Sequence, residues 1–344
     1  MIEVKNLVKR YGNHLAVDHL NFTVETGQVY GFLGPNGAGK STTMNIMTGY
    51  LGATEGKVII NGHDILKEPE AAKKCIGYLP EIPPLYTEMT VLEYLDFVAE
   101  LKKIPQKERK EQIQQVMDLV RVTDMQYRLI RNLSKGYKQR VGLAQAIMGF
   151  PEIIILDEPT VGLDPKQIIE IRELIRELAK NHTVILSSHI LGEIQEVCDY
   201  IMIISHGRLV ASDTPENLEK RMSGQQAVEF VARGSKEQAE YIVEHMAEVQ
   251  EYTLSDGEEE GTVRGSIIPQ AGKDIREAVF CAFAESGCPL LMLNHSRTTL
   301  EDVFLELTQK SQDIRPEAEE EPETLEETEE EEQSGEEEEH AGDL

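Results

Sequence analysis

The sequence predicts an α/β protein whose mixed sheet is followed by a small α+β unit and an acidic tail. The run Ile153–Leu156 contains only aliphatic residues, which suits a strand covered on both faces. An earlier apolar run, Val29–Leu33, leads into a glycine-rich turn. From 151 to about 210, strand and helix patterns alternate, as is typical of a parallel sheet.

The stretch Gly34–Ser41 follows the first of these strands with the spacing GxxxxGK[ST]. Only glycine lets the backbone turn tightly enough for several N–H groups to converge on one anion. The next helix points its positive end at the same place, so Lys40 can reach the β- and γ-phosphates and Ser41 can hold Mg²⁺. An ordinary glycine-rich turn is the alternative, but the strand–turn–helix context favours a nucleoside triphosphate. The residues assigned to the nucleotide here are Gly34, Pro35, Asn36, Gly37, Ala38, Gly39, Lys40, Ser41 and Thr42.

The segment from about 85 to 150 is predicted to be mainly helical. Before it, Glu55–Gly62 is predicted to be a strand followed by a turn. Within it, two sets of apolar residues recur at helical spacing. These sets are Val91, Leu92, Leu95, Val98 and Leu101, and then Ile113, Val116, Met117 and Val120. Such faces usually belong to the core, so no functional role is assigned to any of them.

Two carboxylates, Asp157 and Glu158, end the strand Ile153–Leu156. The carboxyl end of a parallel strand is where α/β proteins place their ligands. Asp157 can bind Mg²⁺ directly or through water, and Glu158 can orient or deprotonate an attacking water. An acidic pair at a strand end could instead cap the next helix. Together with the glycine-rich loop, the pair is assigned to phosphate chemistry.

Residues from about 226 to 310 are predicted to form a second, smaller unit. Its elements are a strand at Gln226–Ala232, a helix at Lys236–Met246, strands near 248–254 and 261–268, a helix over 273–285 and a strand at Leu290–Asn294. The apolar face of the second helix consists of Ile275, Ala278, Val279, Ala282 and Phe283. A last helix opens with a capping box from Thr298 to Glu301. The order β-α-β-β-α-β predicts a ferredoxin-like fold with an extra helix, in a regulatory, dimer-supporting or purely structural role.

The chain is acidic, with a formal net charge of −28, and much of that charge lies at its end. Ser311–Leu344 holds 17 acidic residues and one basic residue, Arg315. Such a segment cannot bury enough apolar surface to offset its ordering entropy, so we predict that it is disordered. It either solubilises the chain or docks on a basic patch of a partner. The charge argues against nucleic acid and anionic lipid as direct partners.

Four further features, taken with the two motifs above, give the chain a resemblance to the ABC ATPases. Leu133–Arg140 resembles the signature sequence of that family, and Pro159–Pro165 resembles its loop across the dimer seam. His189 follows an apolar strand, where the family has its switch histidine. Tyr11 falls where these proteins stack an aromatic ring on adenine. The resemblance covers roughly the first 220 residues.

The resemblance implies a role for each of these residues. Tyr11 would offer its π face to adenine, and His189 would hydrogen-bond the γ-phosphate and report its loss. Ser134 and Gly136, at the start of a helix, would meet the γ-phosphate bound by the opposite subunit, so that ATP joins two cassettes. Asp164 is carried over with the same nucleotide-contacting set. Taken alone, these residues could instead be a strand tyrosine, a strand-end histidine and a helix N-cap.

Two places depart from the family's pattern. The signature usually has two glycines and then glutamine, whereas this chain has Lys135 and Tyr137; the serine and glycine that matter most remain. Glu81 stands where the family has a glutamine that touches Mg²⁺ and faces the membrane partner. A carboxylate can also ligate Mg²⁺, although it adds negative charge beside the triphosphate. Glu81 is therefore a hypothetical metal ligand beside Ser41 and Asp157.

As a member of this family, the chain is expected to be an ATPase that uses ATP and Mg²⁺ and powers a separate transmembrane permease, for export. A second cassette would complete a homodimer. No run of about 18 apolar residues exists, so the chain is expected in the cytoplasm, held to the inner face of the membrane by the permease. Two other classes compete: a soluble ABC ATPase acting on the ribosome or DNA, and a small-molecule kinase.

The expected domain division follows the same resemblance. The ATP-binding cassette spans 1–222 and contains the helical subdomain at about 85–150. The small α+β domain spans 225–310, and the acidic tail spans 311–344.

Overall fold

The computed structural model describes residues 1–222, 227–259, 261–270, 273–296 and Phe304. The predicted helix at Thr298 and the acidic tail therefore lie outside the described residues, apart from Phe304. No helix in the described part of the chain is both long enough and apolar enough to cross a bilayer.

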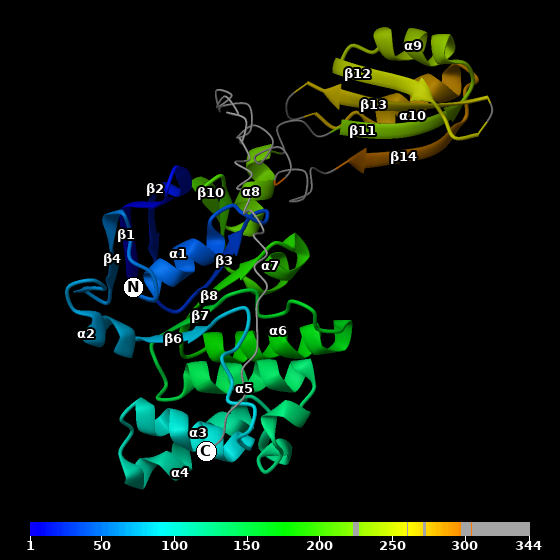
Figure 1. Ribbon diagram of the computed structural model, residues 1–344. Helices are drawn as coiled ribbons and strands as arrows, with labels where there is room; N and C mark the ends of the chain where they lie inside the picture. Colours follow the sequence, from blue (N-terminus) through cyan, green and yellow to red (C-terminus); the bar gives the residue numbers. More distant parts are fainter. Residues whose placement is uncertain (223–226, 260, 271–272, 297–303, 305–344) are drawn as a thin grey trace, which may run out of the picture.

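The first sheet is antiparallel and lies at the N-terminal side of the molecule (Figure 1). Its strand order is β2 (His14–Val24), β1 (Ile2–Tyr11), β4 (Glu55–Ile60) and β5 (His63–Asp64). β1 and β2 form a hairpin in which Tyr11 pairs with His14. The predicted strand at Glu55–Gly62 is confirmed as β4.

The second sheet has six strands and forms the centre of the fold. Its order is β10 (Arg208–Asp213), β9 (Tyr200–Ser205), β3 (Val29–Leu33), β8 (Thr183–Ser188), β7 (Ile153–Leu156) and β6 (Ile76–Leu79). Strands β6 to β9 and β3 run parallel, as predicted. β10 turns back antiparallel to β9, which makes the sheet mixed. Every residue of β7 is buried, because one face of this strand packs in a cluster with helices that follow in the chain and the other packs in a cluster with the first sheet and the helix after β3.

Eight helices of this part of the chain are described (Figure 1). They are α1 (Lys40–Met47), α2 (Pro69–Lys74), α3 (Val91–Leu101), α4 (Gln106–Leu119), α5 (Lys135–Ile147), α6 (Pro165–Ala179), α7 (Leu191–Val197) and α8 (Pro215–Met222). The two helices predicted from apolar spacing are confirmed as α3 and α4. The capping box of Thr90 and Glu93 starts α3. Leu101, counted on its apolar face, is exposed at the last position of the helix.

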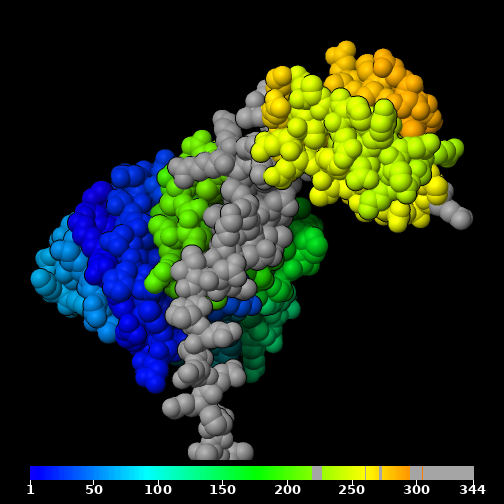
Figure 2. Space-filling view, turned by 90° about the horizontal axis from the view of Figure 1, so that it is seen from above, coloured from blue at the N-terminus to red at the C-terminus, as the bar shows by residue number. Residues whose placement is uncertain are grey.

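The third sheet belongs to the C-terminal unit, which forms a lobe of its own in Figure 2. Its elements are β11 (Ala227–Arg233), α9 (Lys236–Glu244), β12 (Val249–Asp256), β13 (Thr262–Pro269), α10 (Arg276–Glu285) and β14 (Leu290–Ser296). The antiparallel order β12-β13-β11-β14 confirms the predicted ferredoxin-like fold. Phe230 of the sheet packs on Phe283 of α10 with ring centroids 4.7 Å apart.

Two details of the α10 prediction are wrong. The helix begins at Arg276, three residues later than predicted, because the Asp274 carboxylate accepts a hydrogen bond from the Arg276 backbone N–H at 3.1 Å and binds its guanidinium. Ala278, placed on the buried face by spacing, is exposed. The buried face consists of Ile275, Val279 and Phe283.

Candidate nucleotide-binding site

The glycine-rich loop between β3 and α1 needs glycine for steric reasons. A Cβ on Gly34 would lie 2.3 Å from the carbonyl oxygen of Ile204, and one on Gly39 would lie 2.5 Å from that of Ala16. Gly37 and Gly39 also have positive φ angles, +80° and +100°, which side chains with a Cβ rarely adopt. The loop can therefore approach the neighbouring backbone and turn its N–H groups toward the N-terminus of α1.

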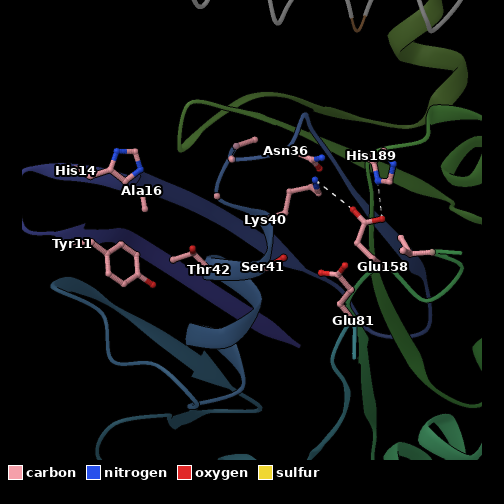
Figure 3. Close-up of a pocket in the computed structure, with 14 residues that line it drawn as sticks. Tyr11, His14, Ala16, Asn36, Lys40, Ser41, Thr42, Glu81, Glu158 and His189 are labelled. Carbon is pink, nitrogen blue, oxygen red and sulfur yellow. Dashed lines mark hydrogen bonds and ion pairs between the residues drawn. The ribbon is translucent and has the colours of Figure 1, made fainter. Parts of the chain in front are cut away.

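Lys40 is the first residue of α1, and its side chain is only 6% exposed. Its ammonium donates a hydrogen bond to the carbonyl of Gly34 at 2.8 Å and lies 3.5 Å from Oε1 of Glu158. Figure 3 shows both charged groups directed toward each other across the site. A phosphate could take the place of these acceptors, since a lysine ammonium offers three donors.

Ser41 and Asp157 meet between α1 and the end of β7. The Ser41 hydroxyl donates to Oδ1 of Asp157 at 3.1 Å, and the Ser187 hydroxyl donates to the same oxygen at 2.5 Å. Hydroxyl and carboxylate oxygens are the ligands that Mg²⁺ prefers, so Ser41 and Asp157 could hold that ion. The structure thus brings this predicted pair together, although the two residues are 116 positions apart in the chain.

Glu158 lies between Lys40 and His189. Its Oε2 is 3.0 Å from Nδ1 of His189, and its own backbone N–H donates to the Ser187 hydroxyl at 2.9 Å. Glu158 also has φ of +48°, a left-handed conformation that costs of the order of 1–3 kcal/mol for a residue with a side chain. This strained conformation occurs where the chain leaves β7 and the Glu158 carboxylate enters the site.

Lys40, Ser41, Glu158 and His189 line a cavity of about 440 Å³ (Figure 3). Its walls contain nine residues of the predicted site: Tyr11, Asn36, Gly37, Ala38, Gly39, Lys40, Ser41, Thr42 and Glu158. The predicted residues Glu81 and His189 also line it, which makes eleven, whereas the predicted residues Gly34, Pro35 and Asp157 do not. Tyr11 stands at the rim, 48% exposed, with the Lys9 ammonium 5.2 Å from its ring centroid.

Ser187 and His14 belong to this site and were missed from the sequence. His14 lines the cavity on the same side as Tyr11, because the two residues pair across the β1–β2 hairpin. The hairpin turn at Gly12 was the available signal for His14. For Ser187, the signal was a hydroxyl at the end of the strand that precedes His189.

Ser134, Gly136 and Asp164 do not line the cavity. Ser134 caps α5 by accepting a hydrogen bond from the N–H of Tyr137, and Asp164 caps α6 by accepting one from Gln167 at 2.9 Å. A Cβ on Gly136 would lie 2.7 Å from the Gln167 side chain, so the starts of α5 and α6 adjoin each other. These predicted residues therefore gather at a second surface, with the exposed Ser134 and Asp164 available to another molecule.

Glu81 also borders a second hollow of about 670 Å³, which Ser41 and Asp157 also line. Ser41 and Asp157 line this hollow on one side, and the exposed side chains of Tyr50 and Ile82 line it on the other. Tyr78 lies in the same wall, where burial raises the pKa of its phenol and the negative charge of Asp157 raises it further. Glu81 thus connects the cavity to an open groove.

Replacing Glu81 by glutamine tests whether its carboxylate binds the metal. An amide oxygen can still ligate Mg²⁺ and removes one negative charge, so Glu81→Gln should keep ATP turnover within about threefold. The half-saturating Mg²⁺ concentration should rise only slightly. Steady-state ATPase rates over a Mg²⁺ titration measure both, with Glu88→Gln, in the same loop, as the matched control. Complete loss of activity would show that the carboxylate itself is required.

The chain resembles proteins of one family in both sequence and structure. Residues 17–161 match the family model described as ABC transporter. The chain is 36% identical over 310 residues to the bacitracin transport ATP-binding protein BcrA of Bacillus licheniformis, covering 89% of this chain and 97% of that protein. It is 31% identical over 312 residues to the linearmycin resistance ATP-binding protein LnrL of Bacillus subtilis, covering 90% and 99%.

One of the solved structures that this chain resembles contains a nucleotide. It is a dimeric ATP-binding cassette in a post-hydrolysis state, bound to ADP and Pi, with a TM-score of 0.57 and 25% identity. The match covers 62% of this chain and 98% of that cassette.

Proposed function

We propose that this chain, which belongs to the ABC transporter family of ATP-binding proteins, powers a separate transmembrane permease that exports its cargo. The chain is an ATPase of that family. The observation that carries the ATPase part of the proposal is the contact of the buried Glu158 carboxylate with both Lys40, which follows the glycine-rich loop, and His189. This arrangement supplies a base, a cation and a γ-phosphate sensor at one point.

ATP with Mg²⁺ is the proposed ligand of the cavity. The N–H groups of the glycine-rich loop and Lys40 would neutralise the β- and γ-phosphates, and Tyr11 would stack on the adenine. Ser41 and Asp157 would hold Mg²⁺, with Glu81 as a further ligand. Mg²⁺, when bound, bridges the phosphates and offsets the charge that develops on them. Glu158 would then accept a proton from the attacking water, while His189 contacts the γ-phosphate.

Two copies of the chain are proposed to share two ATP molecules. Ser134 and Asp164, at the starts of α5 and α6, do not line the chain's own cavity and are exposed. In a symmetric pair, each copy would present Ser134 and Gly136 to the γ-phosphate held by its partner. The homodimer is supported by the dimeric cassette that this chain resembles.

The groove beside Glu81 is the proposed contact with the permease. Its outer wall exposes two large side chains, Tyr50 and Ile82, each 82% exposed. Apolar groups exposed at the rim of a groove mark surfaces that a partner covers. Because Glu81 lines both the groove and the nucleotide cavity, a permease segment bound there would sense the metal site directly. The permease would hold the chain at the cytoplasmic face of the membrane.

Export is proposed from the relatives. One is named for bacitracin transport and another for linearmycin resistance, and both match this chain along nearly their whole length. A resistance protein is expected to help move its compound out of the cell. The cargo itself would be selected by the permease.

A pull-down from native membranes tests the proposed partner. Tagged Glu158→Gln protein, loaded with ATP and Mg²⁺ in detergent, should recover a stoichiometric multi-span membrane protein that mass spectrometry can identify. The double variant Ile82→Asp/Tyr50→Asp is the matched control, because it changes the groove without touching the glycine-rich loop, and it should lose the partner. Recovery of ribosomal or DNA-associated proteins, with no membrane protein, would support a soluble ABC ATPase instead.

A further inference from the structure

A second carboxylate, Glu193, is buried close to the proposed catalytic residues. It lies in the first turn of α7, four residues after His189, and only 5% of it is exposed. It forms no ion pair with a described residue. A buried carboxylate needs hydrogen bonds to offset the loss of water, so its partners show what it holds.

Both partners of Glu193 are hydroxyls that follow or precede a proposed catalytic residue. Thr160, two residues after Glu158, donates to Oε2 of Glu193 at 2.6 Å. Ser188, immediately before His189, donates to the same oxygen at 3.0 Å. The Thr160 and Ser188 side chains are themselves buried, so neither hydroxyl can replace this bond with a bond to water.

Two neighbouring serines at the end of β8 form hydrogen bonds with two different groups. Side chains alternate along a strand, so Ser187 and Ser188 point to opposite sides. Ser187 contacts Asp157 and the backbone of Glu158, whereas Ser188 contacts Glu193. The loop that carries Glu158 is therefore bound to β8 from both sides, and the second attachment passes through Glu193.

We propose that Glu193 is a positioning residue for ATP hydrolysis, which ties the loop after Glu158 to the strand end that carries His189. The inference rests on the proposed roles of Glu158 and His189. The loop after Thr160 continues to Asp164, which lies on the surface proposed to meet the second cassette. Through Glu193, the position of that loop sets the position of His189, so hydrolysis depends on engagement of the second copy.

This role differs from simple packing in what it predicts. A carboxylate that only fills space affects folding, but a positioning residue lowers kcat while ATP binding stays intact, because neither Thr160 nor Ser188 lines the cavity. Glutamine keeps a carbonyl oxygen that can accept both hydroxyls. Leucine keeps the size and removes the acceptor.

Steady-state ATPase kinetics of the full-length chain test the proposal. Glu193→Leu should lower kcat by about tenfold or more, with KM within about threefold, because it leaves two buried hydroxyls unpaired. Glu193→Gln keeps an acceptor and should restore kcat to within about threefold of wild type. Thr183→Val, which also replaces a buried polar side chain by an apolar one but at the other end of β8, is the matched control and should leave kcat unchanged.

Hydroxyl variants keep the test informative if Glu193→Leu fails to fold. Thr160→Val and Ser188→Ala should each lower kcat, and the double variant should lose less than the product of the two losses, because both hydroxyls act through one carboxylate. Independent, multiplicative losses, or a wild-type rate in Glu193→Leu, would overturn the inference. Glu158→Gln is assayed alongside: if it retained turnover, the catalytic assignment would fail, whatever the result at Glu193.

Discussion

Glu158→Gln should bind ATP and hydrolyse almost none of it. General-base catalysis contributes a factor of about 10² to 10⁴, and an amide cannot accept the proton of the attacking water. Lys40 lies 3.5 Å from Oε1 and His189 lies 3.0 Å from Oε2 of the carboxylate. In the amide, the oxygen can still accept from Lys40 and the NH₂ group can donate to Nδ1 of His189 when that atom is an acceptor, so the site should keep its shape. A phosphate-release assay measures turnover, and equilibrium dialysis with labelled ATP measures binding.

The same variant should accumulate a dimer held together by ATP. In the proposed dimer, hydrolysis would release the second copy, so a chain that binds ATP without cleaving it should elute as a dimer, which light scattering detects. Glu152→Gln is the matched control, since Glu152 is an exposed carboxylate just before β7, the strand that leads to Glu158. It should hydrolyse ATP normally. A wild-type rate in Glu158→Gln would mean that another group activates the water.

The central sheet and the phosphate-type loop could be predicted because their signals are local. Four aliphatic residues in a row define β7, and the GxxxxGK[ST] spacing of the loop is contained in one short segment, although the backbone groups that crowd Gly34 and Gly39 belong to the distant residues Ile204 and Ala16. The ferredoxin-like unit was likewise predicted from the order of its strands and helices. Its helix α10 begins three residues later than predicted, because the Asp274 side chain accepts a hydrogen bond from the backbone N–H of Arg276. The spacing of apolar residues carries no information about such a hydrogen bond.

The missed residues depend on pairing between distant segments. Ser187 and Ser188 are indistinguishable in the sequence, and the register in which β8 pairs with β7 decides which of them faces Asp157. Likewise, His14 reaches the cavity because of the hairpin register with Tyr11. The gathering of Gly136 and Asp164 around Gln167 joins the starts of two helices. Such long-range registers follow from tertiary packing, which cannot be deduced from local patterns in a single sequence.

Lys40→Ala should act on the earlier step and weaken ATP binding itself. A hydrogen bond between charged groups contributes about 1.5–3 kcal/mol, so its loss should raise the dissociation constant by roughly 10- to 100-fold. The variant also leaves the buried Glu158 without its cation, and that uncompensated charge opposes the triphosphate further. Lys40→Met separates the two causes, because it restores the aliphatic packing but not the charge. Isothermal titration with ATP should give equal losses for both variants and none for Lys57→Ala, an exposed lysine on β4. If Lys40→Met bound ATP as wild type does, packing rather than charge would be what Lys40 supplies, and the proposed phosphate contact would be wrong.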